Sequence, residues 1–232
     1  MKRLTRILIL STSTLLGLIL FVAGCKKSED PAIIPTTVTD IDGNVYHTVS
    51  IGSQVWMVDN LQVTRYNDGT EIPCVPDSAA WVNLKIQGYC WYDNNATANK
   101  NSYGALYNGY VLSAGKNIAP VGWHIPSDAE WSILTTFLGG ENVAGIKLKE
   151  AGSQYWSIMN TSATNESGFT ARPGGYRGSF AKFTGRGIVG FWWSSTPYYS
   201  GFFYRYMYDD DSKVESNNIN KELAYSIRCI HD

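Results

Sequence analysis

The sequence contains few of the residues that most metal and catalytic sites use. It has only three histidines and four cysteines in 232 residues, and no two cysteines form a Cys-x-x-Cys pair. A structural zinc site of the usual cysteine and histidine spacing is therefore excluded. The Gly-x-Ser-x-Gly motif of serine hydrolases and the zinc-protease motifs are also absent. The commonest hydrolase chemistries thus have no support in this chain.

Charged residues are scarce as well, at 17% of the chain, and basic residues are not in excess. The first 24 residues hold three basic residues and no acidic ones. The remainder has 16 basic and 20 acidic residues, and hence a net charge of −4. Nucleic-acid binding requires a basic surface, so we expect no nucleic-acid partner.

Long hydrophobic runs are absent apart from one near the N-terminus, at residues 7–22. Polar residues 11–14 interrupt this run, and it is shorter than the roughly 20 residues that span a bilayer. Basic residues precede the run, and two small residues follow it directly before Cys25. This order predicts a lipoprotein signal peptide over residues 1–24, with Cys25 as the lipidated residue.

Acylation of Cys25 would anchor the chain in a membrane through its N-terminal lipid. Residues 25–37 then form a lipidated tether, because this polar, proline-containing linker is too short of apolar residues to fold. Residues 26–30 resemble the short acidic signals that export lipoproteins to the surface of Bacteroidetes-type bacteria. We expect a lipoprotein of the outer membrane, exposed at the cell surface or facing the periplasm. Ordinary secretion is the alternative.

Aromatic residues and glycines are abundant, with 8 Trp, 15 Tyr and 22 Gly. The chain after the tether is long enough for one domain with a core, which we place at residues 38–232. Alternating apolar and polar residues predict a strand at residues 45–51, and further strands are expected at 54–58, 201–208 and 224–230. A short helix is expected at residues 103–112.

The best-defined predicted helix begins after Ser127. Ser127 and Glu130 have the spacing of a capping box, in which each side chain binds an unpaired backbone N–H of the other residue. Trp131 and Leu134 share one face of this helix, and Gly139 ends it. His124 and Glu130 admit a second interpretation as an acid–base pair, but the helix cap is the better explanation of Glu130.

Several short motifs occur in an order that resembles a known family. They lie at residues 40–46, 51–57, 120–124, 165–169, 192–196 and 228–229. Together they resemble the Fibrobacter succinogenes major paralogous domain, a family of bacterial surface and secreted proteins, over residues 38–232. That family is similar in fold to formylglycine-generating-enzyme and C-type-lectin-like domains. The resemblance implies a compact α+β domain with two short helices, a small twisted antiparallel sheet and long loops.

The resemblance also bears on the cysteines that follow the tether. Many relatives carry a cysteine just before the motif at residues 120–124, where this chain has Ala119. Cys229 then pairs elsewhere or stays reduced, and Cys90–Cys229 is the disulfide that we favour, because Cys74 lies in a proline-flanked loop. An oxidase of the formylglycine-generating type needs reactive thiols that hold copper, and no cysteine neighbours Cys229 in the final segment.

Two groups of residues are candidates for ligand binding. Exposed aromatic rings stack on sugars and anchor protein interfaces, which makes Trp192, Trp193, Tyr198 and Tyr199 candidates. Core packing is the favoured alternative for most of the aromatic residues in this region. If the strand lies at the surface of a thin sheet, at most one of the two adjacent tryptophans is core, because they face opposite ways. Carboxylates bind calcium, but for the run Asp209-Asp210-Asp211 a solvated hairpin turn is the more economical interpretation. We expect no other metal or cofactor.

The first functional hypothesis is a non-catalytic binding or adhesion module on the cell envelope, whose ligand is a glycan or a surface protein. The alternatives are an enzyme on a formylglycine-generating-enzyme-like scaffold with an unidentified site, and a structural subunit of a surface assembly. The calcium-binding sugar motifs of C-type lectins, Glu-Pro-Asn and Trp-Asn-Asp, are absent.

Overall fold

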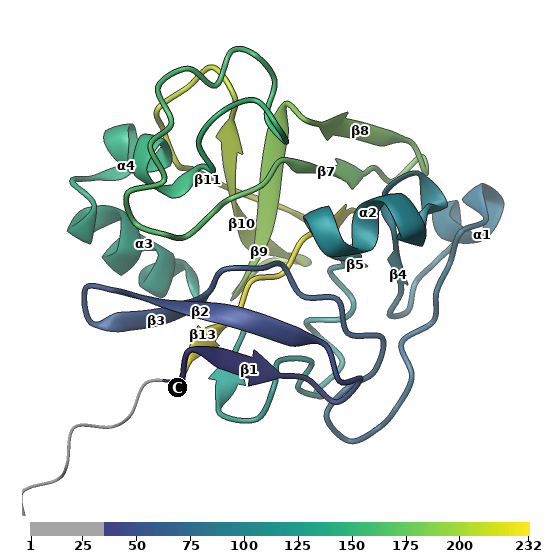
Figure 1. Ribbon diagram of the computed structural model, residues 1–232. Helices are drawn as coiled ribbons and strands as arrows, with labels where there is room; N and C mark the ends of the chain where they lie inside the picture. The colour runs from purple at the N-terminus through teal and green to yellow at the C-terminus, as the bar shows by residue number, and fades with distance from the viewer. Residues whose placement is uncertain (1–34) are drawn as a thin grey trace, which may run out of the picture. The chain divides into compact units, whose positions relative to one another are not determined.

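The computed structural model describes residues 35–232. The predicted signal peptide, the lipidation site Cys25 and most of the tether lie outside the described residues. No helix in the described part of the chain is both long and apolar enough to cross a membrane. The described residues form one compact unit built from two β-sheets and short helices (Figure 1).

The smaller sheet joins the beginning and the end of the domain. Its five strands have the order β1-β2-β3-β13-β6, and all pairings are antiparallel. The C-terminal strand thus lies between β3 and β6, where Ile230 pairs with both Trp56 and His124. The strand bounds are β1 Thr37–Thr39, β2 Val45–Ile51, β3 Gln54–Met57, β6 Trp123–His124 and β13 Ile230–His231.

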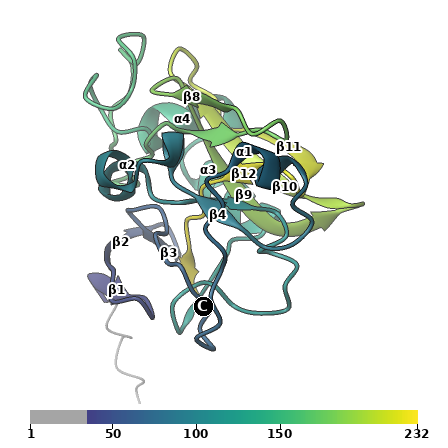
Figure 2. The same ribbon diagram turned by 90° about the vertical axis from the view of Figure 1, so that its right-hand side faces the viewer.

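The larger sheet has eight strands in the order β11-β10-β9-β7-β12-β5-β4, with β8 paired to β7 off this path. Its pairings are antiparallel except for β7 with β9. Figure 2 shows β9, β10 and β11 next to one another. The bounds are β4 Tyr89–Cys90, β5 Leu106–Asn108, β7 Gly174–Arg177, β8 Phe183–Arg186, β9 Val189–Tyr198, β10 Gly201–Tyr208, β11 Glu215–Asn220 and β12 Ala224–Tyr225.

Four short α-helices occur in the described residues, where two were predicted. They are α1 Ser78–Val82, α2 Ala96–Tyr103, α3 Asp128–Phe137 and α4 Glu141–Leu148, and a 3-10 turn η1 spans Tyr92–Asn94. Figure 1 shows α3 and α4 beside β9 and β10, with α1 on the opposite side of the domain. The α+β class is confirmed, while the sheets are larger than the single small sheet that was expected.

The predicted helix at residues 103–112 is wrong, because α2 ends at Tyr103 where that helix was expected to begin. Gly104 follows with a φ of +73°, and a Cβ there would lie 2.7 Å from Asn60 Cβ and 2.8 Å from the carbonyl oxygen of Leu61. The chain therefore turns at Gly104 and continues into strand β5. By contrast α3 begins at the predicted capping box of Ser127 and Glu130.

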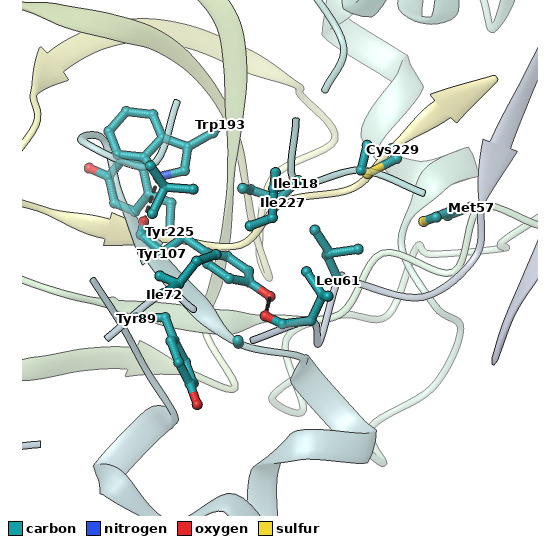
Figure 3. Packing of buried hydrophobic residues seen from close by; sticks show 14 of the residues in the cluster. Met57, Leu61, Ile72, Tyr89, Tyr107, Ile118, Trp193, Tyr225, Ile227 and Cys229 are labelled. Atoms are coloured by element: carbon teal, nitrogen blue, oxygen red, sulfur yellow. Dashed lines mark hydrogen bonds between the residues drawn. The ribbon is translucent and has the colours of Figure 1, made fainter. Parts of the chain in front are cut away.

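The core is rich in aromatic side chains and consists of three clusters. One cluster lies between the larger sheet and the helices α3 and α4, and contains Trp56, Trp131 and Trp192. Another lies on the other side of β9, and Figure 3 shows Trp193 beside Tyr225 and Tyr107 in it. Since both faces of β9 meet a core cluster, this strand is covered on both sides along its first half.

Candidate functional site

Both tryptophans that were predicted as ligand-binding candidates are fully buried. Trp192 packs near Trp131 and donates its indole N–H to Asn60 Oδ1 at 2.9 Å. Trp193 packs against Tyr225 with its ring tilted and donates its indole N–H to the backbone carbonyl of Tyr107 at 2.7 Å. The two rings face opposite ways as expected, but both are core, because β9 is a central strand with side chains packed on both faces and not a strand at the surface of a thin sheet. Neither ring is available to a ligand.

The two tyrosines that were predicted with them lie at the far end of the same hairpin and are exposed. Tyr198 is 40% exposed and Tyr199 is 94% exposed. The Tyr198 ring lies edge to face against the rings of Tyr199, at 4.6 Å, and Phe203, at 5.2 Å. The hairpin tip therefore presents a small group of mutually ordered aromatic rings.

The backbone at the tip adopts a conformation that favours glycine. Residues 199 and 200 connect β9 to β10, with Tyr198 paired to Gly201. Tyr199 has a φ of +45°, in the left-handed region that costs a non-glycine residue roughly 1–2 kcal/mol. Its exposed ring gains no core packing that would offset this cost. Tyr199 thus combines an exposed side chain with a backbone conformation that is costly for a non-glycine residue.

Two asparagines on the neighbouring strand β11 lie opposite residues of this hairpin. Asn218 pairs with Phe203 across the two strands, and Asn220 pairs with Gly201. Asn220 is exposed and accepts a hydrogen bond from the Ser200 hydroxyl at 3.4 Å. We call this surface the aromatic edge; it consists of Tyr198, Tyr199, Phe203, Asn218 and Asn220. It combines aromatic faces with amide donors and acceptors.

The N-terminus of α3 holds the aromatic edge in place. The backbone N–H of Ser195 donates to the carbonyl of Pro126, and that of Asp128 donates to Thr196 Oγ1. From β10 the buried Arg205 forms ion pairs with Asp128, at 2.8 Å, and with Glu141, at 2.5 Å. These contacts hold the part of the hairpin that adjoins its exposed tip.

The capping box of α3 is part of a larger ionic cluster with His124. The His124 ring nitrogens lie 2.8 Å from Glu130 Oε1 and 2.7 Å from Asp232 Oδ1. Burial lowers the pKa of His124, but the hydrogen bonds to Asp232 and Glu130 outweigh burial and raise it above its usual value. Both ring nitrogens contact carboxylates, so the cluster links the start of α3 to Asp232 beside strand β13.

The run Asp209-Asp210-Asp211, the weak calcium candidate, surrounds a lysine. The fully buried Lys149 donates hydrogen bonds from Nζ to the backbone carbonyls of Tyr208, Asp209 and Asp211 at 2.7–3.0 Å. No group of three or more His, Cys, Asp or Glu side chains within residues 35–232 is arranged to hold a metal ion. The ammonium group thus occupies the centre of the turn and supplies a positive charge there.

The predicted disulfide Cys90–Cys229 is not formed, since Cys74, Cys90 and Cys229 are all free in the described part of the chain. Cys90 and Cys229 belong to different core clusters, which explains why they do not meet. Burial raises the pKa of the Cys90 thiol to about 12 and also raises that of Cys229. Both thiols are therefore protonated, in contrast to the thiolates that bind copper.

Sequence reasoning missed a polar groove between β2 and α2. This β2–α2 groove has a volume of about 340 Å³. It is lined by Asn44, Val45, His47, Asp59, Gln62, Lys100 and Asn101. These residues come from three separate segments, at 44–47, 59–62 and 100–101, which carry no common motif, so no local signal joins them. A second hollow, of about 460 Å³, includes Cys74.

Comparison with the sequence models of known protein families shows to which family this chain belongs. Residues 49–231 match the sequence model of the Fibrobacter succinogenes major domain. The chain belongs to this family. The match confirms the resemblance seen in the motifs, and it begins within β2 and ends within β13. The Fibrobacter succinogenes major domain therefore includes the whole aromatic edge and most of the β2–α2 groove. No curated protein and no solved structure matches the chain.

Proposed function

We propose that this protein is a lipid-anchored, non-catalytic carbohydrate-binding module of the outer membrane, and that the aromatic edge is its binding surface. The observation that carries the proposal is Tyr199, whose side chain is almost fully exposed while its backbone is held at a positive φ. Selection for stability alone favours glycine at such a position. A tyrosine there is explained by a contact with something outside the domain.

The chemistry of the aromatic edge supports a carbohydrate as the ligand. The faces of sugar rings are apolar and stack on aromatic side chains, while their hydroxyl groups bind amides. Tyr198 and Phe203 supply the rings, and Asn218 and Asn220 supply amides within the same surface. A protein ligand would also find an aromatic anchor here, but the asparagines favour a ligand rich in hydroxyl groups.

The state of the reactive groups supports a non-catalytic role. His124 has carboxylates on both ring nitrogens, and burial keeps the thiols of Cys90 and Cys229 protonated. None of these groups lies on the aromatic edge. An enzyme on a formylglycine-generating-enzyme-like scaffold would need an activated nucleophile, and neither His124 nor the two thiols provide one.

We further propose that the fold is C-type-lectin-like. In support of this, the C-terminal strand β13 lies between β3 and β6, and it therefore joins the two ends of the domain in one sheet. Long connections between short strands and a hairpin that carries exposed side chains at its tip agree with a scaffold that binds through its loops. An experimental structure tests the assignment by superposition on lectin-like domains.

The membrane anchor is tested by changing Cys25 to Ala in the producing bacterium. We expect the variant to accumulate as precursor or to leave the outer-membrane fraction, because the acyl chains that hold the protein are missing. Ser28→Ala is the control, since it changes the tether and retains Cys25. Recovery of the Cys25 variant in the outer membrane at wild-type level would contradict the anchor.

The ligand is sought on a glycan array with the full-length protein, in the presence and absence of calcium. We expect binding that Tyr198→Ala abolishes and that Phe180→Ala retains, because Phe180 is 83% exposed but lies outside the aromatic edge. Binding should not depend on calcium, since Lys149 already occupies the acidic turn. Absence of any glycan signal, or equal binding by both variants, would refute the proposal.

A further inference from the structure

The guanidinium group of Arg228 is buried without a carboxylate partner. Its side chain is 1% exposed, and its hydrogen bonds go only to neutral oxygens. Nε and Nη2 donate to Asn60 Oδ1 at 3.2 and 2.9 Å, and the remaining bonds go to the carbonyls of Phe169 and Thr170. No acidic side chain within residues 35–232 forms an ion pair with it. The guanidinium carbon lies 4.3 Å from the centre of the Phe169 ring.

A buried charge of this kind is normally compensated by an ion of opposite sign. Burial lowers the pKa of Arg228 to about 9, and the nearby charge of Arg172 acts in the same direction. Asp59 and Glu150 oppose this effect without touching the group. Arg172 itself is paired with Glu150 at 2.5 Å, so Glu150 neutralises Arg172 rather than Arg228.

A small polar cavity adjoins the two arginines. Its volume is about 10 Å³, close to that of one water-sized species. Besides Arg172 and Arg228 it is bordered by Val58, Asp59, Asn60, Gln62, Asn101, Ser102 and Gly104. The side chains of Gln62, Asn101 and Ser102 make no hydrogen bond to another residue of the described chain, so their N–H and O–H groups are available to a ligand.

The cavity lies next to the β2–α2 groove. Asp59, Gln62 and Asn101 line both. Lys100, which lines the groove, has no ion-pair partner among residues 35–232 and lies 5.9 Å from the centre of the Trp91 ring. Asp59 is the one carboxylate at the cavity, and its Oδ2 accepts from the backbone N–H of His47 and lies 3.5 Å from the His47 ring. The cavity thus borders a groove that holds one lysine and one carboxylate.

We propose that the cavity between Arg172 and Arg228 binds a monatomic anion, namely a halide ion. A halide accepts hydrogen bonds from amide, hydroxyl and guanidinium groups and compensates the charge of Arg228. This site is separate from the aromatic edge, so the proposal does not depend on carbohydrate binding there.

The test measures the melting temperature of the full-length protein in sodium bromide, sodium formate and sodium gluconate at one ionic strength. Bromide reports a halide, whereas formate and gluconate are too large for the cavity. We expect bromide alone to raise the melting temperature saturably, by about 3–5 °C at ten times the dissociation constant. Stabilisation by formate equal to that by bromide would contradict a halide site.

Direct evidence comes from bromide-soaked crystals, in which anomalous scattering should place an ion between the two guanidinium groups. Asn101→Asp puts a negative charge at the cavity and should remove the anion effect, whereas Asn217→Asp adds the same charge on β11 and should retain it. Arg228→Met tests the central residue directly. If that variant does not fold, Asn101→Asp provides the test. Equal melting curves in all three salts, with no anomalous peak, would overturn the site.

Discussion

The two ends of strand β9 both carry aromatic residues but lie in opposite environments. Trp192 and Trp193 are fully buried, while Tyr198, five residues further on, is 40% exposed and leads to the almost fully exposed Tyr199. Aromatic content alone therefore does not indicate which rings bind a ligand. What separates the halves is the cover that other elements provide, with α3 and α4 on one face and the Tyr107 and Tyr225 cluster on the other.

Gly190 shows how closely the buried half is packed. A Cβ at this position would lie 2.2 Å from the Trp192 ring, so the indole folds over the glycine and fills the space that a side chain would need. The exposed half has the reverse arrangement, since Tyr199 keeps a side chain where the backbone conformation favours glycine. Folding requires a glycine in the first case, and it does not explain the tyrosine in the second.

The largest predicted effect is that of Trp192→Ala, which should lower the free energy of unfolding by about 3–5 kcal/mol because it leaves a cavity in the core. Tyr198→Ala on the same strand should change it by less than about 0.5 kcal/mol, because its ring is partly solvated and touches only the aromatic edge. Urea unfolding followed by tryptophan fluorescence and circular dichroism measures both.

Trp192→Phe is the control for the loss of volume. It keeps most of the apolar contact and loses the hydrogen bond to Asn60, so we expect a cost of about 1–2 kcal/mol. Similar losses for Trp192→Ala and Tyr198→Ala would remove the contrast between the two halves of β9.

The sequence predicts local features of this domain well. The capping box of Ser127 and Glu130 involves residues three positions apart, and α3 begins there as predicted. Helix α4 was missed because its N-cap is Gly140, which has no side chain to signal a start, and because Gly145 interrupts the helical pattern. A Cβ at Gly145 would lie 2.6 Å from the carbonyl of Lys213, which no local rule reveals.

The candidate site depends on contacts that are distant in sequence. The motif that contains Trp192 and Trp193 predicts a strand, but whether that strand has one buried face or two depends on its neighbours β10 and β7. Likewise, Arg228 lies next to Arg172 and Asn60 only in the folded chain. The exposed tyrosines were among the predicted residues, yet their ring geometry and their neighbours on β11 needed the structure.

A smaller effect is predicted for Tyr199→Gly, which should separate stability from binding. The free energy of unfolding should stay unchanged or rise by up to about 1 kcal/mol, because glycine adopts a positive φ without strain. Affinity for the glycan found on the array should fall about 3- to 10-fold with the loss of the stacking ring. Calorimetry for binding and thermal unfolding for stability provide the measurements.

Tyr199→Ala is the matched control, because it removes the ring and retains the strained backbone. We expect it to lose binding as Tyr199→Gly does, without the gain in stability. A glycine variant that binds as tightly as the wild type would show that the ring contributes nothing, and the contrast between the two halves of β9 would then have no functional meaning.

The smallest predicted effect concerns the cluster of His124, Glu130 and Asp232, which holds α3 over the buried half of β9. The pKa of His124 is raised in the folded protein, so its ion pairs contribute stability at pH values below the usual pKa of histidine, and this contribution is lost as pH rises through the raised value. The pKa of Glu130 is lowered, since hydrogen bonds from Ser127 and His124 outweigh burial, and its contribution is lost only under acidic conditions. Because the His124 side chain is 38% exposed, solvent screens the pairs and we expect a loss of less than about 1 kcal/mol between pH 6 and pH 8.5.

Urea unfolding across this range should show the decline in the wild type and a flatter profile in His124→Gln, while the exposed-histidine control His47→Gln keeps the wild-type slope. A flat wild-type profile would mean that α3 covers β9 without help from this cluster, and apolar packing of Trp131 alone would then account for the boundary between the two halves of the strand.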